Sequence, residues 1–185
     1  MKLSYRPEID GLRAIAVGAV ILYHSKINFL NSEIFQGGFI GVDIFFVISG
    51  YLITSIILQE LKTTNDFSFK NFYERRARRI LPVLILVILT SIPFALLILM
   101  PGSLVNFSKS IIYSLVFSSN FFFHFSGQIY GAESGLLKPF LHTWSLSVEE
   151  QFYIIFPLII FFLFKRFNKN IFSFLIAAFF LSLLI

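Results

Sequence analysis

The sequence has 185 residues, of which 57% are hydrophobic and 26 are Phe, and its mean hydropathy is +0.83. A soluble domain of this length would not carry so much apolar surface, so composition predicts an integral membrane protein and excludes cysteine chemistry, because the chain has no Cys. The net charge of +5 comes from basic residues between apolar stretches, which fits membrane topology and anionic lipid and argues against a nucleic-acid partner.

Six apolar stretches predict an all-α, polytopic transmembrane helix bundle. They cover residues 12–24, 39–58, 80–100, 111–125, 148–164 and 171–185. Several approach the ~20 residues that a helix needs to cross the hydrocarbon core. The last stretch reaches Ile185 without a polar flank. We therefore expect residues 1–185 to be the truncated, N-terminal portion of a larger membrane domain with about six membrane helices in this portion.

The first stretch contains two ionisable residues, Arg13 and His24, which are eleven positions apart. In a helix this spacing is about three turns, so both project from one face with roughly 16 Å between them along the axis. Ionisable groups inside a membrane helix are costly, and their usual role is to line a cavity or a functional site. The alternative is that Arg13 reaches the headgroups while His24 caps the helix end at the interface.

The second stretch is rich in small residues, which predicts close packing against a neighbouring helix. These residues are Gly37, Gly38, Gly41, Ser49 and Gly50. Asp43 lies among them and needs a partner, which Arg13, His24 or the N-terminus of its own helix could supply. We expect a structural ion pair for Asp43, and a packing hydroxyl rather than a nucleophile for Ser49.

A polar loop is expected over residues 59–79, before the third stretch, and it ends in four arginines: Arg75, Arg76, Arg78 and Arg79. One interpretation is a cytoplasmic anchor for the following helix. Arginine in place of lysine also suggests phosphate binding, because its planar fork forms two parallel hydrogen bonds to phosphate. A phosphorylated cytoplasmic donor would dock here.

The polar segment 141–153 precedes and enters the fifth stretch. Ser147 with Glu150 or Gln151 resembles a capping box. Capping does not account for Glu149 and Glu150 at the start of an apolar helix, where a carboxylate can orient an imidazole. The remaining histidines, His124 and His142, are expected at the interface, and the spacing of the three histidines gives no metal site.

The basic residues predict a cytoplasmic N-terminus, because cytoplasmic loops concentrate Lys and Arg. In this orientation ten of the 15 Lys and Arg residues lie inside. Lys165, Arg166 and Lys169 then face outward, against the rule. Two explanations stay open: the fourth stretch does not cross the membrane, or the chain lacks the context that fixes its end.

Four segments together resemble the membrane-bound acyltransferase-3 family, which is similar to bacterial O-antigen and peptidoglycan O-acetyltransferases. They are Arg13 with His24, Phe45–Ile53, the Arg76/Arg79 pair before Ile80-Leu81-Pro82, and Trp144–Tyr153. The resemblance runs from Tyr5 to about Pro157. It implies transfer of an acyl group, usually acetyl, from cytoplasmic acyl-CoA to a hydroxyl of a glycan at the outer face of a bacterial membrane, without a metal.

The resemblance also implies a role for each matching residue. His24 matches the essential membrane histidine, Arg13 its partner, and Glu149 the acidic residue of the tryptophan motif, beside Glu150. Arg76 and Arg79 match the arginine pair that would hold the donor phosphates of acyl-CoA, while Arg75 and Arg78 offer a second register. Trp144 and Tyr153 are further candidates in the tryptophan motif. The implied partners are membrane lipids and a carbohydrate acceptor.

In the mechanism that we expect, His24 acts as general base on the acceptor hydroxyl or briefly carries the acyl group. Glu149 orients His24, and Arg13 or the arginine loop holds the donor phosphates. The competing interpretation is a non-enzymatic transporter or assembly subunit, in which Arg13, Asp43, His24 and Glu149 form a buried charge network. A third interpretation is an inactive fragment of an acyltransferase.

Overall fold

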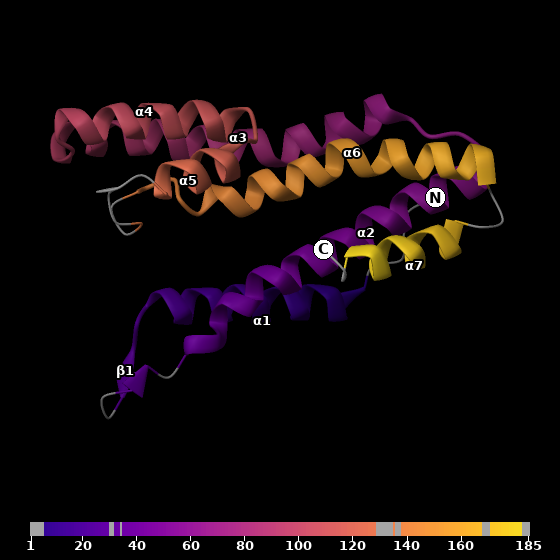
Figure 1. Ribbon diagram of the computed structural model, residues 1–185, viewed down its shortest axis with the longest axis horizontal. Helices are drawn as coiled ribbons and strands as arrows, with labels where there is room; N and C mark the ends of the chain where they lie inside the picture. The colour runs from indigo at the N-terminus through magenta and orange to yellow at the C-terminus, as the bar shows by residue number, and fades with distance from the viewer. Residues whose placement is uncertain are drawn as a thin grey trace. The chain divides into compact units, whose positions relative to one another are not determined.

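The computed structural model describes residues 6–29, 32–33, 35–128, 135, 138–167 and 171–182. These residues are helical apart from turns, short connections and a two-residue hairpin, in which β1 (Asn28–Phe29) pairs antiparallel with β2 (Ser32–Glu33). The chain forms two compact units, Met1–Asp66 and Phe67–Ile185. The ribbon in Figure 1 confirms the predicted all-α class.

The first unit is built on two helices, α1 (Pro7–His24) and α2 (Ile40–Thr64), with the 3-10 turn η1 (Gln36–Phe39) leading into α2. Proline at the first position and acidic residues in the first turn favour the start of α1. α2 ends at Asn65, which adopts the left-handed conformation with φ 54°. Both helices extend beyond the apolar stretches expected for them.

Two glycines allow the backbones of the first unit to approach closely. A Cβ at Gly38 would lie 2.2 Å from the carbonyl oxygen of Ala19, and one at Gly41 would lie 2.5 Å from that of Ala16. Both distances are far below van der Waals contact, so only glycine fits at either position. The predicted packing role is confirmed for these two residues, whereas the other two glycines of this segment have no such neighbour within 4 Å.

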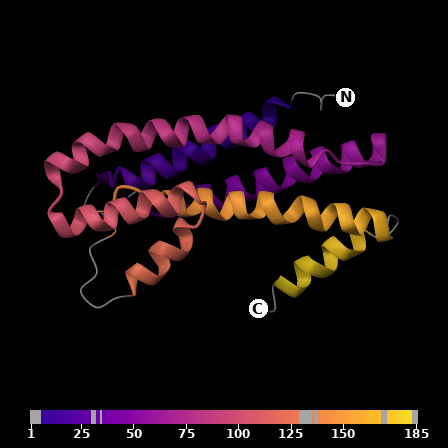
Figure 2. The same ribbon diagram turned by 90° about the horizontal axis from the view of Figure 1, so that it is seen from above.

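The second unit contains α3 (Phe69–Ile98), α4 (Pro101–Leu115), α5 (Ser119–Gly127), α6 (Thr143–Phe167) and α7 (Ile171–Ser182). α3 and α6 run antiparallel, because the Tyr73 hydroxyl donates to the carbonyl of Ile154 at 3.0 Å and the rings of Phe69 and Phe161 are 5.4 Å apart. α4 packs against α3, and α5 against the first half of α6 (Figure 2). The N-terminal part of α3 and the C-terminal part of α6 therefore lie at the same end.

α3 begins eleven residues before the apolar stretch 80–100, so the four arginines lie on a helix and not in the loop expected over 59–79. The Ser68 side chain caps the helix by accepting from the N–H of Asn71 at 3.4 Å. Glu74 and Arg78 add an ion pair of 2.7 Å at the favourable i,i+4 spacing. A cap and good helix formers thus extend the helix into polar sequence.

The stretch 111–125, expected as one membrane helix, is divided between α4 and α5. Phe117 has φ 52°, and the N–H of Ser118 bonds back to the carbonyl of Tyr113 at 2.8 Å. The N–H of Phe117 bonds to the carbonyl of Ser114 at 3.2 Å, which completes a Schellman motif. This motif usually carries glycine at the left-handed position. Phe117 stands there instead, so the glycine that would mark the turn is missing from the stretch.

A cluster of buried hydroxyls joins α4, α5 and α6. The Ser114 and Thr143 hydroxyl oxygens are 2.8 Å apart, those of Thr143 and Ser119 2.9 Å, and those of Ser119 and Ser147 2.7 Å. Such bonds replace water where helices pack in an apolar surrounding. The capping role predicted for Ser147 is wrong, because α6 starts at Thr143 and Ser147 lies one turn inside it.

Among the described residues, three helical segments are long and apolar enough to cross a membrane: Gln36–Thr64, Phe69–Ile98 and Thr143–Phe167. In the most apolar part of each segment, between 17% and 28% of the residues are buried. The remaining apolar surface is left for lipid. α1 has three charged residues among its 18, and α4 and α5 have 15 and nine residues. The chain is a membrane protein.

Candidate functional site

The predicted site residues fall into two groups, one in each unit. Arg13, His24 and Asp43 lie in the first unit. The arginines of α3 and the tryptophan segment of α6 lie in the second unit. Each group has its own geometry.

His24 is the last residue of α1, and its side chain is exposed. Its Nδ1 atom lies 2.8 Å from the carbonyl oxygen of Val20, one turn earlier. A carbonyl oxygen only accepts hydrogen bonds, so Nδ1 carries the proton of the neutral ring and Nε2 is the basic nitrogen. The ring of Tyr23 packs edge-on against His24 at 5.1 Å and against Phe39 at 5.9 Å. The helix thus presents His24 in the tautomer that a general base requires.

Arg13 lies on the same uninterrupted helix, about three turns before His24. Its Nη1 atom is 3.5 Å from the Asp10 carboxylate, and the Arg13 side chain keeps 30% of its surface exposed. A partly exposed pair at this distance holds the guanidinium weakly. Arg13 thus lies near the start of α1, paired only weakly with Asp10 and away from the end that carries His24.

Asp43 is exposed and forms no ion pair or hydrogen bond with any residue in the described part of the chain. The ion pair expected with Arg13 or His24 is thus not formed there. Asp43 lies in the first turn of α2, where the helix dipole stabilises a carboxylate. The N-terminus of α2 is the partner that the structure gives to Asp43.

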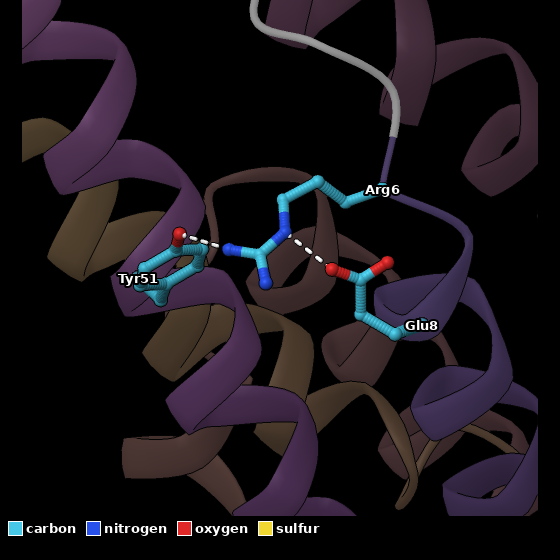
Figure 3. Close-up of polar contacts among 3 residues, drawn as sticks. All are labelled: Arg6, Glu8 and Tyr51. Carbon is cyan, nitrogen blue, oxygen red and sulfur yellow. Dashed lines mark hydrogen bonds and ion pairs between the residues drawn. The ribbon is translucent and has the colours of Figure 1, made fainter.

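Sequence reasoning missed a contact between the start of α1 and the 45–53 segment of α2. Arg6 donates from Nη1 to the Tyr51 hydroxyl at 2.8 Å and from Nε to Glu8 at 2.5 Å, as Figure 3 shows. The Glu8 carboxylate accepts from its own backbone N–H and from Arg6, which together lower its pKa. Glu8 in turn raises the pKa of Arg6. From the sequence, Arg6 was only one of the basic residues of the N-terminal segment.

In the second unit, the arginine and tryptophan segments meet at Arg76. The guanidinium carbon of Arg76 is 4.7 Å from the centre of the Tyr153 ring and 5.7 Å from that of Phe72. Both distances are within the range of cation–π attraction. Arg76 is half-buried, Tyr153 is 3% exposed, and the Tyr153 hydroxyl donates to the carboxylate of Glu149. Two segments 70 to 80 residues apart in the chain form one cluster here.

Glu150 adds a second carboxylate to this cluster. Its side chain is 7% exposed, and its Oε1 atom has no hydrogen-bond partner among the described residues. Arg76 attracts Glu150 electrostatically, and Glu149 repels it. A buried carboxylate next to a half-buried cation is costly to maintain, so such pairs are usually functional or register-setting.

The other three arginines of α3 are exposed. Arg78 is held by Glu74 through Nε at 3.0 Å and Nη2 at 2.7 Å. Arg79, three residues after Arg76, lines a groove of about 300 Å³ together with His142 and Leu146 from the α6 region. Arg76 and Arg79 therefore face α6. This geometry favours the Arg76/Arg79 register over Arg75/Arg78.

Gln151 has a role that the sequence did not indicate. Its Nε2 donates to the carbonyl of Phe117 at 2.7 Å and to Oδ1 of Asn120 at 2.9 Å, so it holds the turn between α4 and α5. Trp144, by contrast, is 39% exposed at the start of α6. The tryptophan segment thus serves both the arginine cluster and the packing of α5.

The remaining histidines lie at the surface. His124 is 3.0 Å from the side-chain amide of Gln128, and the His142 ring stacks on Phe140 at 6.3 Å. Within the described ranges, no three His, Asp or Glu side chains come together as a metal site would require. The charged groups that gather in the second unit are arginines and carboxylates.

Comparison with known proteins identifies relatives of the chain. The family described as acyltransferase domain matches residues 6–185. The O-acetyltransferase OatA of Staphylococcus aureus strain NCTC 8325 is 39% identical over 180 residues, which cover 97% of this chain and 29% of OatA. A putative O-acetyltransferase of S. aureus strain MSSA476 is 43% identical over 159 residues, or 86% of this chain and 25% of the relative. No solved structure gives a significant match.

Proposed function

Because the chain belongs to the acyltransferase domain family, we propose that it is part of a membrane-bound O-acetyltransferase. The enzyme moves an acetyl group from cytoplasmic acyl-CoA to a hydroxyl of a cell-envelope carbohydrate. The family match confirms the resemblance drawn from the four sequence segments. The names of the relatives support O-acetyl transfer, and the chain spans less than a third of their length. Donor, acceptor and orientation are parts of the proposal.

The observation that carries the proposal is the placement of Arg76 against Tyr153, beside Glu149 and Glu150. A guanidinium that is held by cation–π contacts rather than by hydrogen bonds keeps its N–H groups for the parallel hydrogen bonds that phosphate accepts. Arg79 follows one turn later and lines the groove along α3. Together these two arginines would bind the phosphates of acyl-CoA.

His24 supplies the acid–base chemistry in this proposal. Nε2 takes the proton of the acceptor hydroxyl while the hydroxyl oxygen attacks the acyl carbonyl carbon. The carbon–sulfur bond then breaks, the CoA sulfur leaves as the thiolate, and the imidazolium returns the proton to it. The bond from Nδ1–H to the Val20 carbonyl keeps one proton on Nδ1 while Nε2 gains and then returns the other. A contact between Glu149 and His24 stays a prediction.

We also propose a multi-pass arrangement in a bacterial plasma membrane with a cytoplasmic N-terminus. The antiparallel pairing of α3 and α6 supports it, because it brings Lys165 and Arg166 to the end where Lys70 lies. α4 and α5 then form a hairpin that enters and leaves from the outer side. This hairpin removes the outward-facing basic cluster that six crossings would produce.

The test measures transfer from labelled acetyl-CoA to a membrane glycan extract, using the protein as its gene encodes it. Changing Arg76→Ala together with Arg79→Ala should raise the KM for acetyl-CoA at least tenfold, because each charge-assisted bond is worth about 1.5–3 kcal/mol. The acceptor KM should stay constant, and the wild-type donor KM should rise with salt.

Arg78→Ala is the matched control, because Arg78 is paired with Glu74 on the surface of the same helix. An unchanged donor KM in the double variant would remove the phosphate role. Absence of transfer by correctly inserted wild-type protein would favour the transporter interpretation over the enzyme.

A further inference from the structure

Tyr153 touches both charged partners of the cluster in the second unit. Its ring lies under the Arg76 guanidinium at 4.7 Å, and its hydroxyl donates to Glu149. We propose that Tyr153 is a positioning residue of the donor site: its ring fixes the orientation of Arg76, and its hydroxyl ties that cation to Glu149. The inference rests on the proposed function, because it names the residue that orders the arginine which would bind the donor.

Arg76 needs such a support because a long, half-buried side chain otherwise samples many rotamers. Tyr153 and Phe72 are 3% and 2% exposed, so neither ring can move away from the guanidinium without disturbing the packing. Arg76 thus contacts two fixed aromatic rings, one from each helix. A planar cation ordered in this way loses less freedom when it binds a phosphate.

A hydrogen bond next to the Arg76–Tyr153 contact fixes the distance between α3 and α6. The hydroxyl of Tyr73, three residues before Arg76, donates to the carbonyl of Ile154, the residue after Tyr153. This bond is 3.0 Å long and joins α3 directly to α6. The contact between Arg76 and the Tyr153 ring is therefore a property of the packed helix pair.

The contact also leaves Arg76 able to bind an anion. Cation–π attraction does not occupy the N–H groups of the guanidinium as a hydrogen bond to a protein acceptor would, and phosphate is bound by those N–H groups. Within the described residues Arg76 forms no hydrogen bond and no ion pair closer than 4 Å. The Tyr153 hydroxyl donates a hydrogen bond to one carboxylate oxygen of Glu149, so an uncharged group holds Glu149 beside the Arg76 guanidinium.

The experiment measures binding of coenzyme A by calorimetry to the protein in lipid nanodiscs, for wild type, Tyr153→Leu, Tyr153→Phe and Arg76→Ala. Tyr153→Leu removes ring and hydroxyl and should raise the Kd for coenzyme A about tenfold. Tyr153→Phe restores the ring and should recover most of this loss. The double variant Arg76→Ala with Tyr153→Leu should bind coenzyme A no more weakly than Arg76→Ala alone, because the two residues act through one contact.

Phe123→Leu is the matched control, since it removes a similarly buried ring of the same unit away from any arginine contact. Equal weakening by Phe123→Leu and Tyr153→Leu would reduce Tyr153 to a structural residue and overturn the inference. Wild-type binding by Tyr153→Leu, with weakened binding by Arg76→Ala, would overturn it as well. If wild-type protein fails to bind coenzyme A, or Arg76→Ala binds it normally, the proposed function itself fails.

Discussion

At the scale of single residues, local hydrogen bonds decide which side chains are chemically competent. The bond from His24 Nδ1 to the Val20 carbonyl leaves Nε2 as the basic nitrogen. Helical spacing alone predicted that Arg13 and His24 share a helix, and α1 contains both. The tautomer of His24 and the aromatic contacts of Arg76 could not be predicted, because they depend on rotamers and on residues distant in sequence.

His24→Ala should lower kcat for acetyl transfer by about 10²–10⁴-fold, since a positioned general base typically contributes that much. The variant should still insert into the membrane and bind the donor. His124→Ala, which removes an exposed histidine of α5, is the control and should leave kcat unchanged. Transfer by His24→Ala at the wild-type rate would show that another group takes the acceptor proton.

At the scale of helices, the apolar pattern predicted where helices occur but misplaced several of their ends. Hydropathy measures only how apolar the side chains are, so it placed the start of α3 after the polar arginine segment. A cap and an ion pair make this segment helical. It also did not divide 111–125, because the turn at Phe117 depends on backbone bonds and on Gln151. The glycine pattern predicted the close packing of α1 and α2 at Gly38 and Gly41 better than hydropathy predicted helix ends. The reason is steric, because only glycine allows the two backbones to approach so closely.

Gly41→Ala and Gly50→Ala test that steric cause within one helix. Alanine favours a helix interior over glycine by about 1 kcal/mol, which both variants gain. The Cβ at position 41 would lie 2.5 Å from the Ala16 carbonyl, whereas position 50 has open space. Thermal unfolding in detergent should therefore show a lower Tm for Gly41→Ala than for Gly50→Ala, by an amount that corresponds to about 1–3 kcal/mol of overpacking, and no loss for Gly50→Ala relative to wild type. Equal Tm values would contradict the close packing of α1 and α2.

At the scale of the whole molecule, composition alone established the membrane class, while the number of crossings stays part of the proposal. In the proposed arrangement, the antiparallel pairing of α3 with α6 places Lys70 and Arg166 on one side of the membrane. With six crossings they would lie on opposite sides. The difference arises because a helical hairpin and a spanning helix of similar length have the same hydropathy.

The absence of cysteine makes this difference directly measurable. Single substitutions Lys70→Cys, Arg166→Cys and Gln128→Cys introduce one thiol each at exposed positions. In sealed cells a membrane-impermeant maleimide should label Gln128→Cys only, and the other two should react after permeabilisation. Labelling of Arg166→Cys in sealed cells, with Lys70→Cys unlabelled, would contradict the hairpin and support six crossings.

The turn between α4 and α5 also sets an order for the biogenesis of the protein. The Phe117 carbonyl is satisfied by Gln151 and the Ser119 N–H by Ser147, which follow 34 and 28 residues later in the chain. When the ribosome has delivered α4 and α5, these backbone groups have no partner, and apolar lipid does not tolerate that state. In the proposed membrane arrangement the hairpin can therefore pack only after α6 has been synthesised, so a released chain truncated before residue 147 should keep this segment accessible to protease.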